Sequence, residues 1–196
     1  MTCGLADRSD GELAVLACGG QKAAFGTIVA RHKQALHRLV VRLIDDEDEA
    51  VDIVQEAFIA AHAALPRFDP ARPMRGWLTR IAVNKARDWR RRRIVRRLIS
   101  AVLPDDAVEI PDDVPAIDKA VGDRAELARV NAAIARLPGN LREALVLRAI
   151  EGLSQAEAAE ALGVSEKTIE TRLYRARQRL KADLDRVDFP ARGAKG

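Results

Sequence analysis

Aromatic side chains make up only 4% of this 196-residue chain, which holds two cysteines, Cys3 and Cys18. So few cysteines exclude a disulfide framework and a cysteine-based zinc site. No uninterrupted apolar run is long enough to span a membrane, and no secretory order of charge, apolar run and cleavage site is found at the N-terminus. We therefore expect a soluble, cytoplasmic protein with reduced thiols and no membrane contact of its own.

Signals of catalysis are scarce as well. His32, His37 and His62 have no partner at metal-ligand spacing, and His32 lies on an apolar helical stripe, where a packed histidine is the simpler interpretation. There is no glycine-rich phosphate loop, and no nucleophile has a base at a readable spacing. The sequence therefore predicts no catalytic site, no metal and no cofactor.

The residues that are plentiful favour helix. Apolar residues make up 48% of the chain, alanine and leucine are abundant, and β-branched runs are short. Apolar periodicity predicts helices over 9–98 and again over 124–185, separated by an acidic, proline-bearing stretch. We expect an all-α fold of two small domains, 9–98 and 124–185, with a flexible acidic linker (99–123) and a disordered tail (186–196).

Charge is distributed unevenly, although the net charge is only +4. Arginines crowd the segment 85–97, where their mutual repulsion favours a polyanionic partner such as nucleic acid. The predicted helix that runs to about Leu65 carries an acidic face with Asp52 and Glu56. This face is either a solvated face or a docking surface for a basic partner. The acidic linker is either a solubilising segment, an occupant of a basic channel in a larger partner, or a loose partner of the chain's own arginines.

Residues 154–180 have the pattern of a helix-turn-helix. Ser154 and Glu157 have the form of a capping box, Gly163 suits a left-handed helix end, and Ser165 suits an N-cap. The second helix has an apolar stripe of Ile169, Leu173, Ala176 and Leu180, and a polar face of Lys167, Thr168, Thr171, Tyr174, Arg175 and Gln178. Such a face suits the DNA major groove, although a solvated helix of a bundle has a similar pattern.

The order of these features resembles the extracytoplasmic-function sigma factors of bacterial RNA polymerase, a branch of the superfamily that includes the primary sigma factors. Residues 52–58 (DIVQEAF) are similar to the family's region 2.2 signature, and the run from Trp77 to Asn84 leading into the arginines is similar to regions 2.3 and 2.4. Leu137-Pro138, the helix 141–151 and the helix-turn-helix are similar to region 4. The resemblance covers nearly the whole chain.

The resemblance implies four binding surfaces and no catalytic site. Core polymerase, through its clamp coiled coil, would bind Asp52, Gln55, Glu56 and Ile59. The −10 element would contact Phe68, Arg75, Arg80, Asn84, Lys85, Arg87, Asp88, Arg91 and Arg92, with Asn84 on an extruded base. The −35 element would be read by Ser165, Lys167, Thr168, Thr171, Arg172, Arg175 and Gln178, and the remaining surface of the second domain would meet the polymerase flap.

Two further expectations follow from the resemblance, namely control by an anti-sigma factor and a monomeric free protein. The alternative from another class is an independent helix-turn-helix regulator that binds duplex as a dimer. An enzyme or metalloprotein is the third alternative, and it lacks a plausible cluster of residues.

Overall fold

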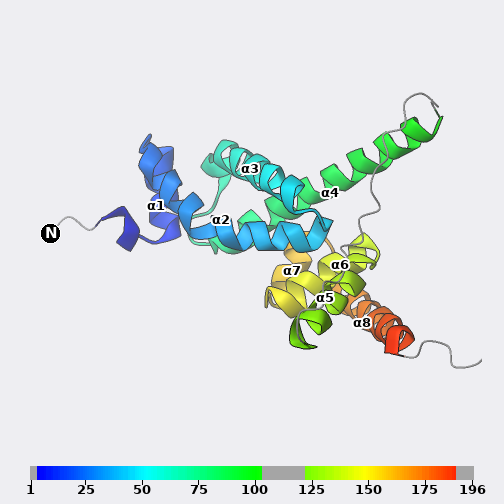
Figure 1. The fold of residues 1–196 in the computed structure, drawn as a ribbon. Coiled ribbons are helices and arrows are strands. Elements are labelled where there is room, and N and C mark those ends of the chain that lie inside the picture. The colour runs from blue at the N-terminus through cyan, green and yellow to red at the C-terminus, as the bar shows by residue number, and fades with distance from the viewer. Residues whose placement is uncertain (1–3, 103–121, 189–196) are drawn as a thin grey trace, which may run out of the picture.

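The computed structural model describes residues 4–102 and 122–188, and this part of the chain contains helices and turns but no strand. Two helical modules follow one another along the chain (Figure 1). The first holds α1 (Asp10–Cys18), α2 (Lys22–Ile44), α3 (Glu47–Ala64) and α4 (Met74–Val102). The second holds α5 (Gly122–Ala135), α6 (Gly139–Leu145), α7 (Gln155–Leu162) and α8 (Glu166–Asp188). The expected all-α class is confirmed.

Local signals in the sequence determine several helix ends. Ser9 with Glu12 and Ser154 with Glu157 form complete capping boxes at the starts of α1 and α7. Gly163 ends α7 with φ at 65°, a left-handed conformation that glycine adopts without a steric penalty. The Ser165 hydroxyl accepts a hydrogen bond from the Thr168 amide at 3.2 Å, as predicted for an N-cap of the helix that follows.

Each module buries the apolar stripe that periodicity predicts. In the first module, α2, α3 and α4 pack together around Ile28, Leu39, Leu43, Ile53 and Leu78. In the second, α6, α7 and α8 pack together around Leu147, Leu162, Ile169 and Ala176. Because the apolar stripe of α8 faces this core, the opposite, polar face of α8 points outward.

Three details of the second module differ from what the sequence predicts, since Asn140 and Glu143 have the spacing of a capping box and helical periodicity places Leu127 and Ile150 inside. Asn140 and Glu143 do not form a capping box, because α6 begins after Pro138 and Glu143 is buried with partners in the first module. Ile150 and Leu127, which periodicity places inside, are exposed. A π-helical turn, η3 (Val146–Ile150), follows α6 and shifts the helical phase, so that Ile150 turns outward.

The predicted boundaries are also displaced. Helix α4 continues to Val102, beyond the predicted end at 98, while α5 begins at Gly122 and α8 continues to Asp188. The predicted linker and tail lie otherwise outside the described residues. Helix ends without a cap signal are the least certain part of any sequence-based prediction.

The two modules are in contact, whereas the sequence predicts two domains that only a linker connects. Helix α7 packs against α4, and α5, α6 and η3 pack against α2. The buried residues of both modules form one continuous apolar cluster. Figure 1 shows the second module lying against one side of α2 and α4, while the C-terminal part of α4 extends away from both.

Candidate nucleic-acid interface

The acidic helix α3 presents part of its predicted docking face to solvent. Asp52, Gln55 and Ile59 are exposed, Ile59 by 70%. A groove of about 720 Å³ lies beside them between α2 and α3, lined by Val51, Val54, Gln55, Phe58, Ile59 and residues of α2. An exposed isoleucine next to an open groove is typical of a surface that another protein covers.

Glu56 and its neighbours instead face α4. Lys85 Nζ lies 3.4 Å from Glu56 Oε2, and Arg92 Nη2 lies 3.7 Å from the same oxygen. Two turns earlier on α3, Glu49 accepts a 2.7 Å hydrogen bond from the indole nitrogen of buried Trp89. The acidic face of α3 therefore neutralises part of the basic face of α4, and Trp89 is a core residue.

The loop before α4 lies against the second module. Phe68 is only 8% exposed and packs on Trp77, with ring centroids 4.9 Å apart, so in this structure its ring is not available to DNA. A cavity of about 150 Å³ separates this loop from α7, lined by Arg67, Phe68, Asp69, Arg72, Pro73, Gly76, Trp77, Arg80, Glu157, Glu160 and Ala161. Arg72 pairs with Glu160 across it.

The predicted −10 residues on α4 fall into three groups, one of which is Lys85, paired with Glu56 of α3. Arg80, Asn84, Arg91 and Arg92 are exposed, and Asp88 is half-buried and pairs with Arg91. Arg75 and Arg87 are instead paired with the second module. Arg75 donates to the Glu151 carbonyl at 2.7 Å and lies 3.3 Å from the Glu151 carboxylate. The sequence does not predict this division.

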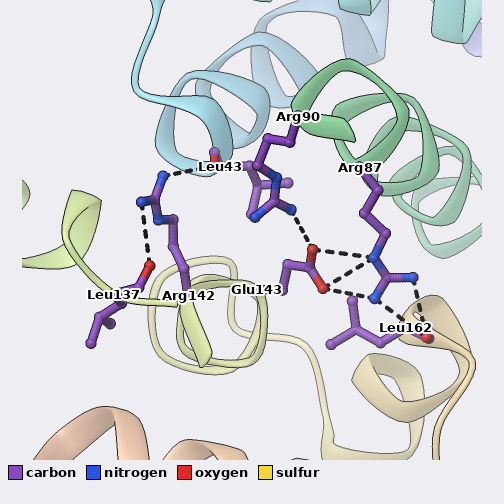
Figure 2. A network of polar contacts seen from close by, with 7 residues as sticks. All are labelled: Leu43, Arg87, Arg90, Leu137, Arg142, Glu143 and Leu162. Atoms are coloured by element: carbon purple, nitrogen blue, oxygen red, sulfur yellow. Dashed lines mark hydrogen bonds and ion pairs between the residues drawn. The ribbon is translucent and has the colours of Figure 1, made fainter. Parts of the chain in front are cut away.

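Arg87, Arg90 and Glu143 form a cluster between the modules (Figure 2). Arg87 Nη2 donates to Glu143 Oε2 at 2.7 Å, and Arg87 Nε lies 3.1 Å from both carboxylate oxygens. Arg90 donates to the other oxygen, and Arg87 also reaches the Leu162 carbonyl at 3.4 Å. Because Glu143 is only 3% exposed, it depends on these charge-assisted bonds to offset its desolvation.

Arg142, next in the chain to Glu143, reaches the first module from the same helix (Figure 2). Its Nη1 donates to the Leu43 carbonyl at 2.9 Å, in the last turn of α2, and its Nη2 lies 3.4 Å from the Leu137 carbonyl. Burial, and then the nearby charge of Arg90, lower the pKa of Arg142. A cation at this position suits both the unpaired carbonyls and the negative end of the α2 dipole.

The polar face of α8 points outward. Lys167, Arg175 and Gln178 are exposed, while Thr168, Thr171 and Arg172 are half-buried. Exposed Ser165 is placed beside Thr168, with the two hydroxyl oxygens 2.9 Å apart, and the Thr171 hydroxyl bonds to the Lys167 carbonyl at 2.9 Å. A groove of about 580 Å³ between α6 and α8 adjoins Tyr174, Arg175 and Gln178. This helix could enter a major groove without rearrangement.

Other site classes find no support in the described part of the chain. Within it, no group of three or more His, Cys, Asp or Glu side chains is placed to hold a metal ion. None of its helices is long and apolar enough to cross a lipid bilayer. His32 bonds to Asp10 at 2.8 Å, and His62 packs edge-on against Phe25, so both have structural contacts.

Comparison with known families decides among the remaining alternatives. The family model of sigma-70 region 2 matches residues 28–96, and that of sigma-70 region 4 matches residues 127–180. The chain belongs to the sigma-70 family. The first module is therefore its region 2 module and the second its region 4 module. The RNA polymerase sigma factor CnrH of Cupriavidus metallidurans is 44% identical over 181 residues, which cover 90% of this chain and 95% of CnrH.

Further relatives agree. The ECF RNA polymerase sigma factor SigE of Mycolicibacterium smegmatis is 34% identical over 89% of this chain and 68% of its own length. The solved structure of CnrH in complex with the cytosolic domain of CnrY has a TM-score of 0.65 at 40% identity, covering 90% of this chain and 97% of CnrH. RpoE of Bartonella quintana, solved with the anti-sigma factor NepR, has a TM-score of 0.66 at 27% identity, covering 82% and 96%.

The functional residues that the sequence does not reveal are those between the modules. Glu143, Glu151 and Glu160 of the region 4 module, and Arg42 and Arg90 of the region 2 module, join the predicted arginines there. Their partners lie tens of positions away in the chain, so no local spacing marks them. The one available signal is Glu143 itself, a charged residue between apolar Leu141 and the apolar pair Ala144-Leu145.

Proposed function

We propose that this sigma-70 family protein is a sigma factor of the extracytoplasmic-function group. It binds core RNA polymerase, directs it to promoters with particular −10 and −35 elements, and starts transcription there. It is not itself an enzyme. The observation that carries this function is the presence of regions 2 and 4 in order, each with an exposed polar or charged helix face.

Each surface has its own task in this proposal. The clamp coiled coil of polymerase binds α3 at Asp52, Gln55, Glu56 and Ile59, where the apolar groove supplies buried area and the acids supply charge complementarity. The α4 face from Arg75 to Arg92 binds the −10 element, with Asn84 on an extruded base and the arginines on phosphate. The α8 face from Ser165 to Gln178 reads the −35 element in duplex form, and the flap of polymerase meets the region 4 module.

The regulatory partner is an anti-sigma factor. The similar structure of RpoE was solved with the anti-sigma factor NepR, and the groove between α2 and α3 offers such a partner an open apolar surface. We propose that the free protein is a cytoplasmic monomer. Region 2 and region 4 then act from one chain, and a two-fold repeat of the promoter is not required.

Transcription in vitro tests the proposal. Core polymerase and the purified protein are incubated with a library of randomised promoters, and the start sites of the transcripts are mapped. We expect transcripts only when the protein is present, from templates that share two spaced elements. An independent regulator would bind duplex DNA without polymerase and would yield no new transcripts, which would contradict the proposal.

The polymerase surface is tested by Asp52→Lys. This side chain is exposed and forms no ion pair or side-chain hydrogen bond within residues 4–102 and 122–188. Glu56, in contrast, pairs with Lys85 and Arg92, so that Lys at 56 would also disturb α4. We expect Asp52→Lys to weaken core polymerase binding by about tenfold, on the scale of about 1.4 kcal/mol. Asp7→Lys, an equal change of charge at an exposed position, is the control. Equal affinities of the two variants would place the clamp elsewhere.

A further inference from the structure

Two of the arginines assigned to −10 DNA already have an anionic partner within the chain. Arg87 is bound by the Glu143 carboxylate at 2.7 Å, and Arg75 by Glu151. The guanidinium donors that face Glu143 cannot bond to a phosphate at the same time, because each N–H donor is directed at one acceptor. In this arrangement a glutamate of the region 4 module occupies the place of a phosphate.

The cover over this part of the DNA face is built from several independent contacts. Helix α7 packs on α4, and Arg72 of the loop before α4 pairs with Glu160. Arg142 donates a hydrogen bond to the Leu43 carbonyl in the last turn of α2. The apolar cores of the modules are continuous beneath these pairs. The contact is therefore a packed interface with buried charges, and it differs from a chance pairing of surface side chains, which contributes little.

The covered and the exposed surfaces serve different steps of transcription initiation in the proposed function. The polymerase face around Asp52 and Ile59 is exposed, and so are Lys167, Arg175 and Gln178 on the −35 face. Of these three surfaces, the −10 face is the one that the region 4 module covers in part, at Arg75, Arg87 and the loop at Phe68. Its other predicted residues Arg80, Asn84, Arg91 and Arg92 stay exposed. A molecule in this state can meet polymerase but cannot fully engage melted DNA.

We propose that the region 4 module is an intramolecular cap on the −10 face, held by Glu143, and that it competes with promoter DNA for Arg87 and Arg75. This inference rests on the proposed function. It implies an order of events in which core polymerase binds first, the two modules then separate, and the −10 strand is bound last. The apparent affinity of the free protein for single-stranded DNA is then the intrinsic affinity multiplied by the fraction of open molecules.

Glu143→Gln tests the cap with little change of shape. The substitution removes the charge that holds Arg87 and Arg90, and both of these partners lie in the region 2 module. Separated modules do not have these contacts, so the substitution weakens the closed state more than the open one. Gly139→Ala is an independent variant, because its Cβ would lie 2.1 Å from Arg90 Nη1 and displace this flexible side chain from Glu143. Alanine also favours helix at this position of α6, so folding is retained.

The assay is binding of the free full-length protein to a fluorescent pool of short single-stranded DNA of randomised sequence, followed by anisotropy. Small-angle scattering gives the radius of gyration of the same samples. We expect Glu143→Gln to bind about tenfold more tightly and to have a larger radius, with Gly139→Ala changed in the same direction. Glu126→Gln, an equal charge change at an exposed position of α5, should match the wild type in both measurements.

Two outcomes would overturn the cap. One is that Glu143→Gln and Gly139→Ala both match Glu126→Gln in affinity and radius. The other is a wild-type radius of gyration that already corresponds to separated modules. Failure of the proposed function is a separate result, since it is read from transcription with core polymerase: the variants would then open and bind single strands while no promoter is transcribed. If Glu143→Gln does not fold, Gly139→Ala decides.

Discussion

Gly11 provides a sharp test of how helix α1 packs against the loop before α4 in the region 2 module. A Cβ at this position of α1 would lie 2.3 Å from the carbonyl oxygen of Pro70, which is backbone and cannot rotate away. The loop would have to retreat by roughly 1 Å to reach ordinary contact distance. Overpacking costs about 1–3 kcal/mol, and an overlap with backbone that cannot rotate away falls in the upper part of this range, about 2–3 kcal/mol. The better helix propensity of alanine returns at most about 1 kcal/mol.

We therefore expect Gly11→Ala to lower stability by about 1–2 kcal/mol. For a chain of this size that corresponds to a fall in melting temperature of about 2–8 °C. The measurement is thermal unfolding followed by circular dichroism. If the proposed function holds, binding of −10 DNA should weaken as well, because Phe68 belongs to the displaced loop, whose turn is held by the bond from the Ala71 amide to Asp69 at 3.0 Å.

Gly26→Ala is the matched control. Gly26 is exposed in the interior of α2, and a Cβ there meets nothing within 4 Å. The same substitution should therefore raise stability by about 0.5–1 kcal/mol. Opposite signs at the two sites support the packing argument. A Gly11→Ala protein that melts at or above the wild-type temperature would refute it.

Three other expectations concern DNA binding and pH. Arg175→Ala should weaken promoter binding and reduce the slope of log affinity against log salt by about one, measured by filter binding of the holoenzyme; an unchanged slope would remove Arg175 from the phosphate contacts. Asn84→Ala should slow open-complex formation, measured with permanganate, more than it weakens closed duplex binding, and equal losses would argue against capture of a base. Burial raises the pKa of Asp10, but hydrogen bonds from His32 and Arg31 outweigh it, so the pKa lies below its ordinary value of 3.8. The stability that Asp10 contributes is thus present above pH 3.8 and is lost as pH falls through the lowered pKa. Asp10→Asn should destabilise the protein in urea at neutral pH, and its difference from wild type should shrink in acid; a constant difference would contradict the linkage.

Local features of the fold are well predicted from the sequence. The capping boxes at Ser9 and Ser154, the left-handed Gly163 and the stripe of α8 each depend on residues within a few positions of one another. A capping motif and a helical period act through short-range geometry, so a single sequence carries them completely. The class of the fold and the face of α8 that points outward follow directly from these signals.

Glu143 shows where such reasoning fails. Its spacing from Asn140 suggests a capping residue, yet the structure places it in the interior against two arginines from α4. This outcome depends on tertiary packing between segments more than fifty positions apart, as the separations within the Glu143 pairs indicate. The sequence does not predict the contact between the modules for the same reason. The acidic linker suggests a loose connection and contains no information about what α7 and α6 pack against.

The bond from Arg142 to the Leu43 carbonyl has a consequence for amide exchange. Leu43 lies two residues before Asp45, whose left-handed backbone turns the chain from α2 into α3, the helix that carries Asp52. If the modules separate, this joint loses its external donor and the last turn of α2 becomes freer to fray. Amide protons around residues 43–47 should then exchange with solvent faster in opened molecules. Amide exchange at the junction of α2 and α3 therefore measures how often the two modules separate.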